Sequence, residues 1–501
     1  MLELFESISL DRDAKSPLYV QLYEKLKEMI VDGTFHIGFH MPSVRRLAKL
    51  LQVNQVTVVS AYRLLEEDRL VYSKLGSGTY VSCSTPVSGR GCPDKNNNII
   101  LDELYHQDDI SIIKSGQIAI NENTVNFASA TPTTDLFPVE DFKAALDEVL
   151  ERDKGNAFAY QDSQGFYPLR EIIYETLKES ILIGSPENIQ VISGAQQGID
   201  IISKAFLKPG DYVITESPTY TGAVAVFKSR GAEIADIQMG ENGPSLNLLE
   251  YNLKKYKPKL IYTIPSFQNP TGYSYPNSKR ADMLKLAERY NAYIIEDDYV
   301  SDLDFEARGF TPIKAMDKYN RVIFIKSFSK IFMPGLRLGF MALPYDIQGK
   351  VVEAKHTTDI STSGLLQRAF DLYIRKGYWS RHFKFMHGIY KQRYLLMTES
   401  LDKRLPGFVN YTRPGGGLNI WLNFPYGYPV GSLLKTCAAN DIVFAPGKIF
   451  YSGSMPQKLN SLRLSFAAVY NEQIKPGIEK FCEIACSLER RQESYRNMPV
   501  F

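Results

Sequence analysis

The stretch that most constrains the fold is 322–340, where an apolar run gives way at once to polar side chains. Residues 322–325 read Val-Ile-Phe-Ile and predict a buried β-strand. Lys330 follows it closely, and Arg337 lies a short way beyond. A desolvated lysine can lose its proton, and the neutral amine then forms a Schiff base with an aldehyde. Because arginine binds phosphate bidentately, the stretch predicts a ligand that carries both an aldehyde and a phosphate.

Other predicted strands also end in residues suited to such a ligand. Asp297 follows the strand 292–296, and an acid against a pyridine-type nitrogen makes the ring a better electron sink. Asn269 follows the strand 260–264, and the segment 193–198 opens a helix whose first backbone amides can bind phosphate. Ligands on parallel sheets bind at these strand ends. The motifs together predict pyridoxal phosphate.

On these motifs, residues 126–486 resemble the fold-type I aminotransferases of the aspartate aminotransferase-like branch. The resemblance implies that Lys330 forms the Schiff base with pyridoxal phosphate. It implies that Asp297 pairs with the ring nitrogen and that Asn269 and Tyr299 hold the ring oxygen. The residues implied to hold the phosphate are Ala195, Gln196, Ser327, Ser329 and Arg337.

Three more roles follow from the same resemblance. Tyr220 matches the aromatic residue that stacks on the cofactor ring, and Tyr160 matches a tyrosine that reaches the phosphate of the partner subunit. Arg463 matches the arginine that grips a substrate carboxylate. The alternatives are packing roles for the two tyrosines and a structural ion pair for Arg463.

Residues 11–82 have a separate pattern of three short helices and a hairpin. The first helix has apolar residues at helical spacing, and Ser43 and Asn54 are predicted to cap the second and third. Two short strands, 70–73 and 79–82, complete the pattern. This is the plan of a winged helix-turn-helix, whose third helix would enter the major groove of DNA.

This segment resembles the GntR family of DNA-binding domains. The motifs that carry the resemblance lie at 17–19, 41–48, 57–58, 61–62 and 76–79. The DNA-contact residues predicted from it are Ser43, Arg45, Asn54, Gln55, Thr57, Arg63, Gly76 and Gly78. Glutamine can read adenine bidentately, so Gln55 predicts an operator rich in A·T pairs. A winged helix that contacts protein is the alternative.

Composition sets outer limits on the protein. A chain of 501 residues exceeds one compact domain, and its net charge of +2 gives no polyelectrolyte character. The five cysteines include no Cys-x-x-Cys pair, which argues against a disulfide framework or zinc site. With neither a signal-type apolar core at the N-terminus nor an apolar run of membrane-spanning length, we expect a cytoplasmic protein. The predicted divisions are a head at 11–82, a linker at 83–125, a body at 126–486 with a large domain at about 150–345 and a small domain at about 346–486, and a charged tail at 487–501.

The expected fold class is multidomain. It joins an N-terminal winged helix-turn-helix (α+β) to an α/β fold-type I transferase body with a small C-terminal α/β domain. This combination resembles the MocR/GabR family of bacterial regulators. The resemblance implies an operator in double-stranded DNA and a homodimer, domain-swapped, whose DNA affinity responds to pyridoxal phosphate or to an amine or amino-acid effector.

Two other functions remain open at this point. One is an active aminotransferase with a DNA-binding head, and the other is a scaffold that binds the cofactor without acting on DNA. Two features favour the regulator. A methyl at Ala130 would crowd a substrate carboxylate, and no cation lies between Gly222 and Phe227, where some relatives have an arginine. The ligand is then the cofactor alone or an unfamiliar amine.

Overall fold

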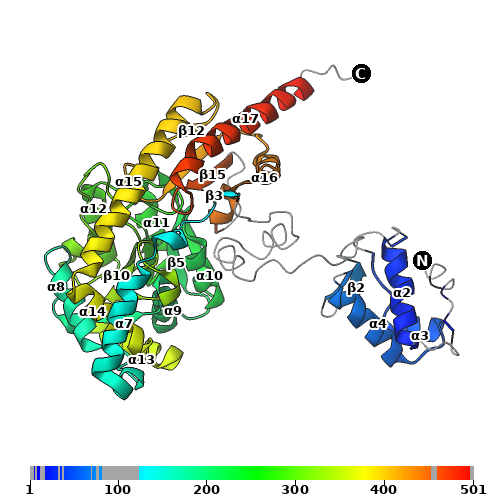
Figure 1. The fold of residues 1–501 in the computed structure, drawn as a ribbon, viewed down its shortest axis with the longest axis horizontal. Helices are drawn as coiled ribbons and strands as arrows, with labels where there is room; N and C mark the ends of the chain where they lie inside the picture. Colours follow the sequence, from blue (N-terminus) through cyan, green and yellow to red (C-terminus); the bar gives the residue numbers. More distant parts are fainter. Residues whose placement is uncertain are drawn as a thin grey trace. The chain divides into compact units, whose positions relative to one another are not determined.

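The chain divides into two compact units, Met1–Lys95 and Asn96–Phe501, which we call the head and the body (Figure 1). The computed structural model describes residues 17–31, 39–68, 70–74, 78–81, 123–452 and 460–496, with a few single residues before position 36. Most of the predicted linker and the wing residue Gly76 lie outside this part. The boundary between the units falls inside the predicted linker.

The head is a winged helix-turn-helix, as predicted. Its elements are α2 (Leu18–Val31), α3 (Val44–Leu50), α4 (Gln55–Glu67), β1 (Val71–Lys74) and β2 (Gly78–Val81). The two strands pair antiparallel, and α4 packs against both α2 and α3. Val58, Ala61, Tyr62 and Leu65 of α4 are buried, and the Tyr62 hydroxyl donates to the Pro42 carbonyl at 2.8 Å. This bond holds α4 against the segment that leads into α3.

The two predicted helix caps in the head behave differently. The side chain of Asn54 accepts a hydrogen bond from the Val56 amide at 3.0 Å, as an N-cap should. Ser43 occupies the N-cap position of α3, but its hydroxyl makes no capping hydrogen bond, so that prediction is wrong for the side chain. Its backbone carbonyl still accepts from the amides of Arg46 and Leu47, which is enough to start the helix.

The body is built on an eight-stranded sheet in the order β4-β11-β10-β9-β8-β5-β6-β7. Its strands are β4 (Ile189–Ile192), β5 (Tyr212–Ser217), β6 (Glu233–Gly240), β7 (Gly243–Pro244), β8 (Leu260–Thr263), β9 (Tyr293–Asp298), β10 (Val322–Ser327) and β11 (Gly339–Ala342). The central run from β10 to β6 is parallel, while β11 and β7 are antiparallel to their neighbours. The carboxyl ends of the parallel strands therefore share one edge.

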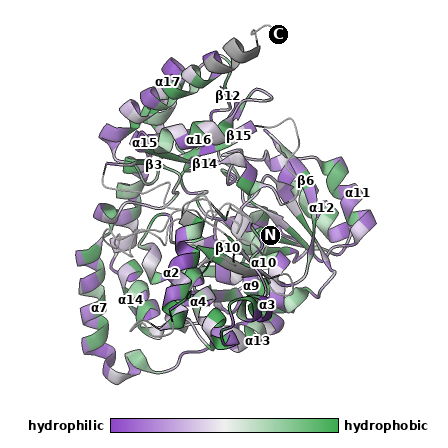
Figure 2. Ribbon diagram, turned by 90° about the vertical axis from the view of Figure 1, so that its right-hand side faces the viewer, coloured by the Kyte–Doolittle hydropathy of each residue, from purple (hydrophilic) through white to green (hydrophobic). Residues whose placement is uncertain are grey.

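Helices cover both faces of this sheet. They are α7 (Val139–Asp153), α8 (Tyr167–Leu177), α9 (Ala195–Phe206), α10 (Thr221–Ser229), α11 (Leu246–Tyr256), α12 (Asn277–Arg289), α13 (Gln348–Asp359) and α14 (Gly364–Arg375). Along β10, Ile323 and Ile325 join one buried cluster with α9, while Phe324 joins another with α7, α8 and α14. Successive strand residues point to opposite faces, so β10 is buried on both sides. Hydrophilic and hydrophobic residues alternate around α7, as expected for a covering helix (Figure 2).

A smaller five-stranded sheet follows, in the order β12-β13-β15-β14-β3. Its strands are β3 (Val125–Phe127), β12 (Asn410–Tyr411), β13 (Asn419–Phe424), β14 (Ile442–Pro446) and β15 (Asn460–Ser465), and the helices beside it are α15 (Tyr378–Arg404), α16 (Val430–Ala438) and α17 (Asn471–Arg496). Strand β13 begins at Asn419, just after the glycines at 415–417. Gly415 and Gly417 have φ of +76° and +71°, which form a turn rather than a strand.

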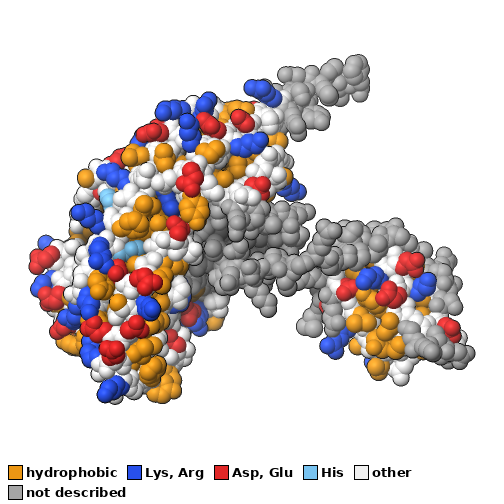
Figure 3. Space-filling view, viewed as in Figure 1, with side chains coloured by type: hydrophobic (Ala, Val, Ile, Leu, Met, Phe, Trp, Pro, Cys, Tyr) orange, Lys and Arg blue, Asp and Glu red, His pale blue; other side chains and the backbone are white. Residues whose placement is uncertain are grey.

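The first part of the predicted charged tail at 487–501 is helical. Helix α17 continues without a break to Arg496, because residues 487–496 contain no glycine or proline to stop it. Acidic and basic side chains are interspersed over the side of the body seen in Figure 3, in keeping with the small net charge. Within the described residues, no helix is both long and apolar enough to span a membrane.

Candidate functional site

One pocket gathers nearly all the residues predicted to bind the cofactor. Its lining consists of Ala195, Gln196, Tyr220, Ile264, Asn269, Asp297, Tyr299, Ser327, Ser329, Lys330 and Arg337. They come from the carboxyl ends of β4, β5, β8, β9 and β10 or from the segments that follow. Ile264 is the one lining residue that was not predicted, since it reads in the sequence only as the end of an apolar run.

Asp297 is a buried carboxyl group of this pocket whose pKa is shifted upward. Its Oδ2 accepts a hydrogen bond from the Tyr262 hydroxyl at 2.6 Å. Its Oδ1 is buried and has no hydrogen-bond partner among the described residues. Burial raises the pKa of Asp297 to about 6, and the bond from Tyr262 opposes that rise. A buried carboxylate oxygen without a donor is a strong acceptor site for a cationic N–H group.

Tyr262 itself was missed by the sequence analysis. It lies in β8, is fully buried, and in the sequence is only one aromatic residue within an apolar strand. Burial raises the pKa of its hydroxyl well above the usual value, so near neutral pH the group is protonated and can donate. Only the pairing of β8 with β9 reveals that it faces Asp297.

Lys330 lies just past the end of β10, where the backbone is tied to a helix. The Tyr390 hydroxyl of α15 donates to the Lys330 carbonyl at 3.0 Å. Burial is the largest effect on the pKa of Asp297 and raises it. The positive charge of Lys330 is one of the effects that lower this pKa. The amine and the carboxylate are therefore within electrostatic reach of each other across the pocket.

The far end of the pocket has the form of an anion cradle. Gly194 has φ of +86°, and a Cβ there would lie 2.4 Å from Nη2 of Arg337. The Arg337 guanidinium donates to the Ser193 carbonyl at 3.0 Å, and the Ser327 hydroxyl donates to Ser329 Oγ at 3.0 Å. Helix α9 begins at the next residue, and Ala195 and Gln196 in its first turn line the same pocket, so its first backbone amides can bind an anion there. Only glycine at 194 lets the guanidinium come this close.

Arg463 is close to the pocket but does not line it. This β15 residue is 2% exposed, and its guanidinium donates to Asn269 Oδ1 at 2.8 Å and to the Ala128 carbonyl. It also lies 5.0 Å from the centre of the Phe450 ring. In this arrangement the arginine orients Asn269 from behind.

Tyr299 lines the pocket, and its hydroxyl is already engaged. It donates to the Phe267 carbonyl at 2.6 Å and accepts from Asn419 Nδ2 at 3.0 Å. To donate to a cofactor oxygen, as predicted, the hydroxyl proton would have to turn away from Phe267. Asn269 offers the more direct polar group.

A buried glutamate, which the sequence did not single out, holds the loop that bears Asn269. Glu216 at the end of β5 accepts hydrogen bonds from the Ile264 amide at 2.8 Å, from Gln268 Nε2 at 2.8 Å, and from the Tyr275 hydroxyl. Burial raises the pKa of Glu216, while these donors lower it. The carboxyl group thus ties the start and end of the loop to the neighbouring strand.

Tyr160 is not part of this pocket. Its side chain is 86% exposed and, with Phe158 and Ser361, lines a second surface hollow. Phe158 is 70% exposed as well. The predicted reach of Tyr160 into a partner subunit stays a prediction.

The predicted DNA-contact residues of the head are mostly on the surface. Ser43, Arg45, Asn54, Gln55 and Arg63 are exposed, and Thr57 is half-buried. Asn54 uses its side-chain oxygen as the cap of α4, which limits its part in base reading. Gly78 begins β2, and Gly76 lies outside the described residues.

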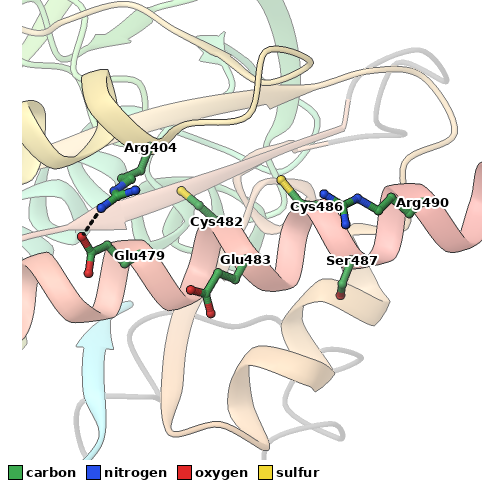
Figure 4. A pocket seen from close by; sticks show the side chains of 7 residues that line it. All are labelled: Arg404, Glu479, Cys482, Glu483, Cys486, Ser487 and Arg490. Carbon is green, nitrogen blue, oxygen red and sulfur yellow. Dashed lines mark ion pairs between the residues drawn. The ribbon is translucent and has the colours of Figure 1, made fainter.

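Another hollow lies where α15 meets α17, lined in part by Cys482 and Cys486. Their sulfur atoms point to the same side of α17, near an ion pair of Arg404 with Glu479 at 3.1 Å (Figure 4). Burial raises the pKa of Cys482 to about 12, so its thiol stays protonated and is a poor nucleophile. Among the described residues, no cluster of histidine, cysteine and acidic side chains suits a metal ion.

Comparisons with known proteins agree with this geometry. Residues 122–481 match the family model of aminotransferase class I and II, and residues 18–81 match that of the gntR family of bacterial regulatory proteins. The uncharacterized HTH-type transcriptional regulator YisV of Bacillus subtilis is 30% identical over 95% of this chain and 97% of its own length.

Two solved structures resemble the body. The multiple substrate aminotransferase of Thermococcus profundus has a TM-score of 0.71 at 30% identity, over 77% of this chain and 96% of its own. The α-aminoadipate aminotransferase LysN of Thermus thermophilus, complexed with N-(5'-phosphopyridoxyl)-L-leucine, has a TM-score of 0.68 at 30% identity, over 77% of this chain and 100% of its own. The chain belongs to the aminotransferase class I and II family, and its N-terminal head belongs to the gntR family of bacterial regulatory proteins.

Proposed function

We propose that the protein is a DNA-binding transcriptional regulator of the MocR/GabR type, whose body binds pyridoxal phosphate and responds to it or to an amino compound. The observation that carries the proposal is the presence in one chain of two parts. One is a gntR-type head with an exposed recognition helix, and the other is a pocket lined by the predicted cofactor residues. Relatives that share both parts over nearly their whole length bear the name of transcriptional regulators.

The pocket fits pyridoxal phosphate at each of its functional groups. Asp297 Oδ1, buried without a partner among the described residues, would accept from the ring nitrogen, and Asn269 would hold the ring oxygen. The cradle at Gly194 and Arg337 would hold the phosphate. When bound, the cofactor supplies an aldehyde carbon for an amine and a ring that withdraws electrons from it. The Lys330 amine is the group of this chain that would attach to that carbon.

On the DNA side, α4 would enter the major groove, and Arg45 and Ser43 at the start of α3 would contact phosphates. The positive charge of one head is small, so two heads linked in a dimer would bind far more tightly than one. The exposed Tyr160 and Phe158 suit a contact with a second copy of the body. We therefore place the function in a homodimer, domain-swapped as in the family that the chain resembles.

Coupling between the two parts follows from linkage. A ligand can change DNA affinity only if it binds one arrangement of the protein more tightly than another. An amino compound that competes with Lys330 for the cofactor would release the Lys330 amine and take its place on the cofactor, so the contacts within the pocket would change. That change is the signal that the linker would carry to the head.

A gel-shift or anisotropy titration tests this proposal. Full-length protein is titrated onto DNA from upstream of its own gene, with and without pyridoxal phosphate and across a salt series. We expect sequence-specific binding whose affinity changes with the cofactor, and no such change in the Lys330→Ala variant. Specific binding with the same affinity in both conditions would contradict cofactor sensing, and sequence-blind binding would contradict the regulator itself.

An active aminotransferase is the second candidate. The observation in its favour is that Lys330, Asp297 and Asn269 all line one pocket, with Arg463 directly behind it. Turnover of amino donors with keto acids, followed as loss of donor, would support this candidate. The regulator does not require full transamination turnover; one half of the transamination cycle, or none, would be enough for it.

A further inference from the structure

The outer face of the recognition helix α4 carries two exposed valines. Val56 is 67% exposed and Val59 is 50% exposed, while Val58, Ala61 and Leu65 on the opposite face are fully buried. Residues three apart on a helix are neighbours on one side, so the valines form a single small apolar surface. The core of the head is complete without them.

These valines do not serve the helix either. β-Branched residues lose side-chain freedom in a helix, and valine is a weaker helix former than alanine, glutamate or lysine. On an exposed helical position, where packing does not decide the choice, the stronger formers are favoured. A pair of valines at the first two turns of α4 is therefore explained by something that the helix contacts.

The charges around the valines identify that partner as DNA. The neighbouring helix α3 packs on α4 and carries the exposed cations Arg45, Arg46 and Lys49, and it has no acid. From its start to Arg63, α4 has no acid either. Basic side chains beside an uncharged apolar centre complement phosphates that flank the edges of bases. A protein partner would need no such basic surround.

We propose that Val56 and Val59 contact the 5-methyl groups of thymines in the major groove. The thymine methyl is the apolar group that bases present in that groove. Two residues three apart lie roughly 4.5 Å apart along a helix, close to the roughly 3.4 Å between base pairs, so they reach one pair or two adjacent pairs. With Gln55 beside them, the surface reads A·T pairs. This inference rests on the proposed DNA-binding function and names what the head recognises.

Deoxyuridine substitution tests the contact from the DNA side, without any change to the protein. Full-length protein selects a binding site from a random-sequence DNA pool, and each thymine of that site is replaced singly by deoxyuridine. We expect one or two thymines per half-site at which loss of the methyl weakens binding about fourfold, the effect of one buried methyl group. The same replacement is then repeated with Val56→Ala, Val59→Ala and, as a control on the body surface, Val139→Ala.

In the valine variants of α4 the deoxyuridine effect should vanish at the matching thymine, and with Val139→Ala it should remain. The inference is overturned if no thymine methyl affects binding to the selected site, or if the effect persists in both α4 variants. It is also overturned if both variants bind the selected site as the wild type does, since the valines then face another partner. If the wild type selects no sequence at all, the proposed regulator function fails together with the inference.

Discussion

The pocket of the body and the face of α4 proposed to read DNA differ in how their residues are fixed. In the pocket, Asp297 lies near the end of β9 and Asn269 in the loop after β8, and hydrogen bonds from Tyr262 and Arg463 hold them in place. The outer face of α4 meets solvent, and only its inner face is set by packing. The side chains of the buried pocket are thus positioned by contacts within the protein, whereas the outward side chains of α4 are positioned only when a partner binds. The two should therefore respond to mutation independently until cofactor and DNA are both present.

The largest effect is expected at the lysine of the pocket. Lys330→Ala should abolish covalent attachment of pyridoxal phosphate, because Lys330 is the one lysine among the described residues that line this pocket. Borohydride reduction followed by mass spectrometry of peptides measures the adduct. Lys318→Ala, an exposed lysine of the body, serves as the control and should keep the adduct. Cofactor-free DNA binding should match the wild type in both, and an adduct in Lys330→Ala would contradict the assignment.

Next comes the buried carboxyl group beneath the loop of Asn269. Glu216→Ala would leave several buried donors without an acceptor, and we expect a loss of about 3 kcal/mol or more in the free energy of unfolding. Both tryptophans, Trp379 and Trp421, lie in the body, so their fluorescence in denaturant follows the body alone. The exposed Glu288→Ala is the control. Equal midpoints for the two variants would show that the Glu216 contacts are not holding the loop.

A head variant should weaken DNA binding without changing cofactor affinity, unlike the body variants above. Arg45→Ala removes an exposed cation at the start of α3, so operator binding should weaken and the slope of log K against log salt should fall by about one. Cofactor affinity should not change. Arg289→Ala, an exposed arginine of the body, is the comparison variant. An unchanged salt slope would mean that Arg45 does not contact a phosphate.

The smallest effect concerns pH. Burial raises the pKa of Asp297 to about 6, so its carboxylate form, which would pair with the ring nitrogen, becomes dominant only above that pH. Cofactor affinity should therefore rise as the pH increases through about 6. Tyr262→Phe removes the bond that lowers this pKa and should move the rise upward by about one pH unit.

The control for this shift is Tyr373→Phe, whose buried hydroxyl has no hydrogen-bond partner among the described residues. An identical pH midpoint in Tyr262→Phe and the wild type would show that Tyr262 does not set this pKa. The folding stability of the cofactor-free protein depends on pH in the opposite direction to cofactor affinity. The raised pKa of Asp297 contributes stability that is fully present below its ordinary value of 3.8 and is lost as the pH rises through about 6.

The sequence predicted the fold of both units because hydrophobic periodicity and strand-end chemistry are local signals. It located Lys330, Asp297 and Asn269 for the same reason, since polar residues after buried strands meet at one edge of a sheet. It could not find Tyr262 or Glu216. Their roles depend on which strands pair, and in the sequence they read as an aromatic core residue and an isolated acid.

The head shows the opposite limit. The core of the head and the order of its helices could be predicted, but only some of the residues on the outward face of α4 could. Val56 and Val59 were missed because an apolar residue in a helix is ordinarily a core residue, and only their exposure in the folded head shows that they face outward. The Ser43 hydroxyl was assigned to a cap that the backbone makes without it. The charged composition of residues 487–501 gave no sign that helix α17 continues to Arg496.

The measurement that tests the central claim most directly is reciprocal linkage. The affinity of the full-length protein for its selected operator is measured with and without saturating pyridoxal phosphate, and the affinity for pyridoxal phosphate is measured with and without saturating operator. Thermodynamics requires the two ratios to be equal. We predict a common ratio different from one, by about fivefold or more, and abolished by Lys330→Ala. A ratio of one in both directions would mean that the pocket and the head share a chain without sharing a function.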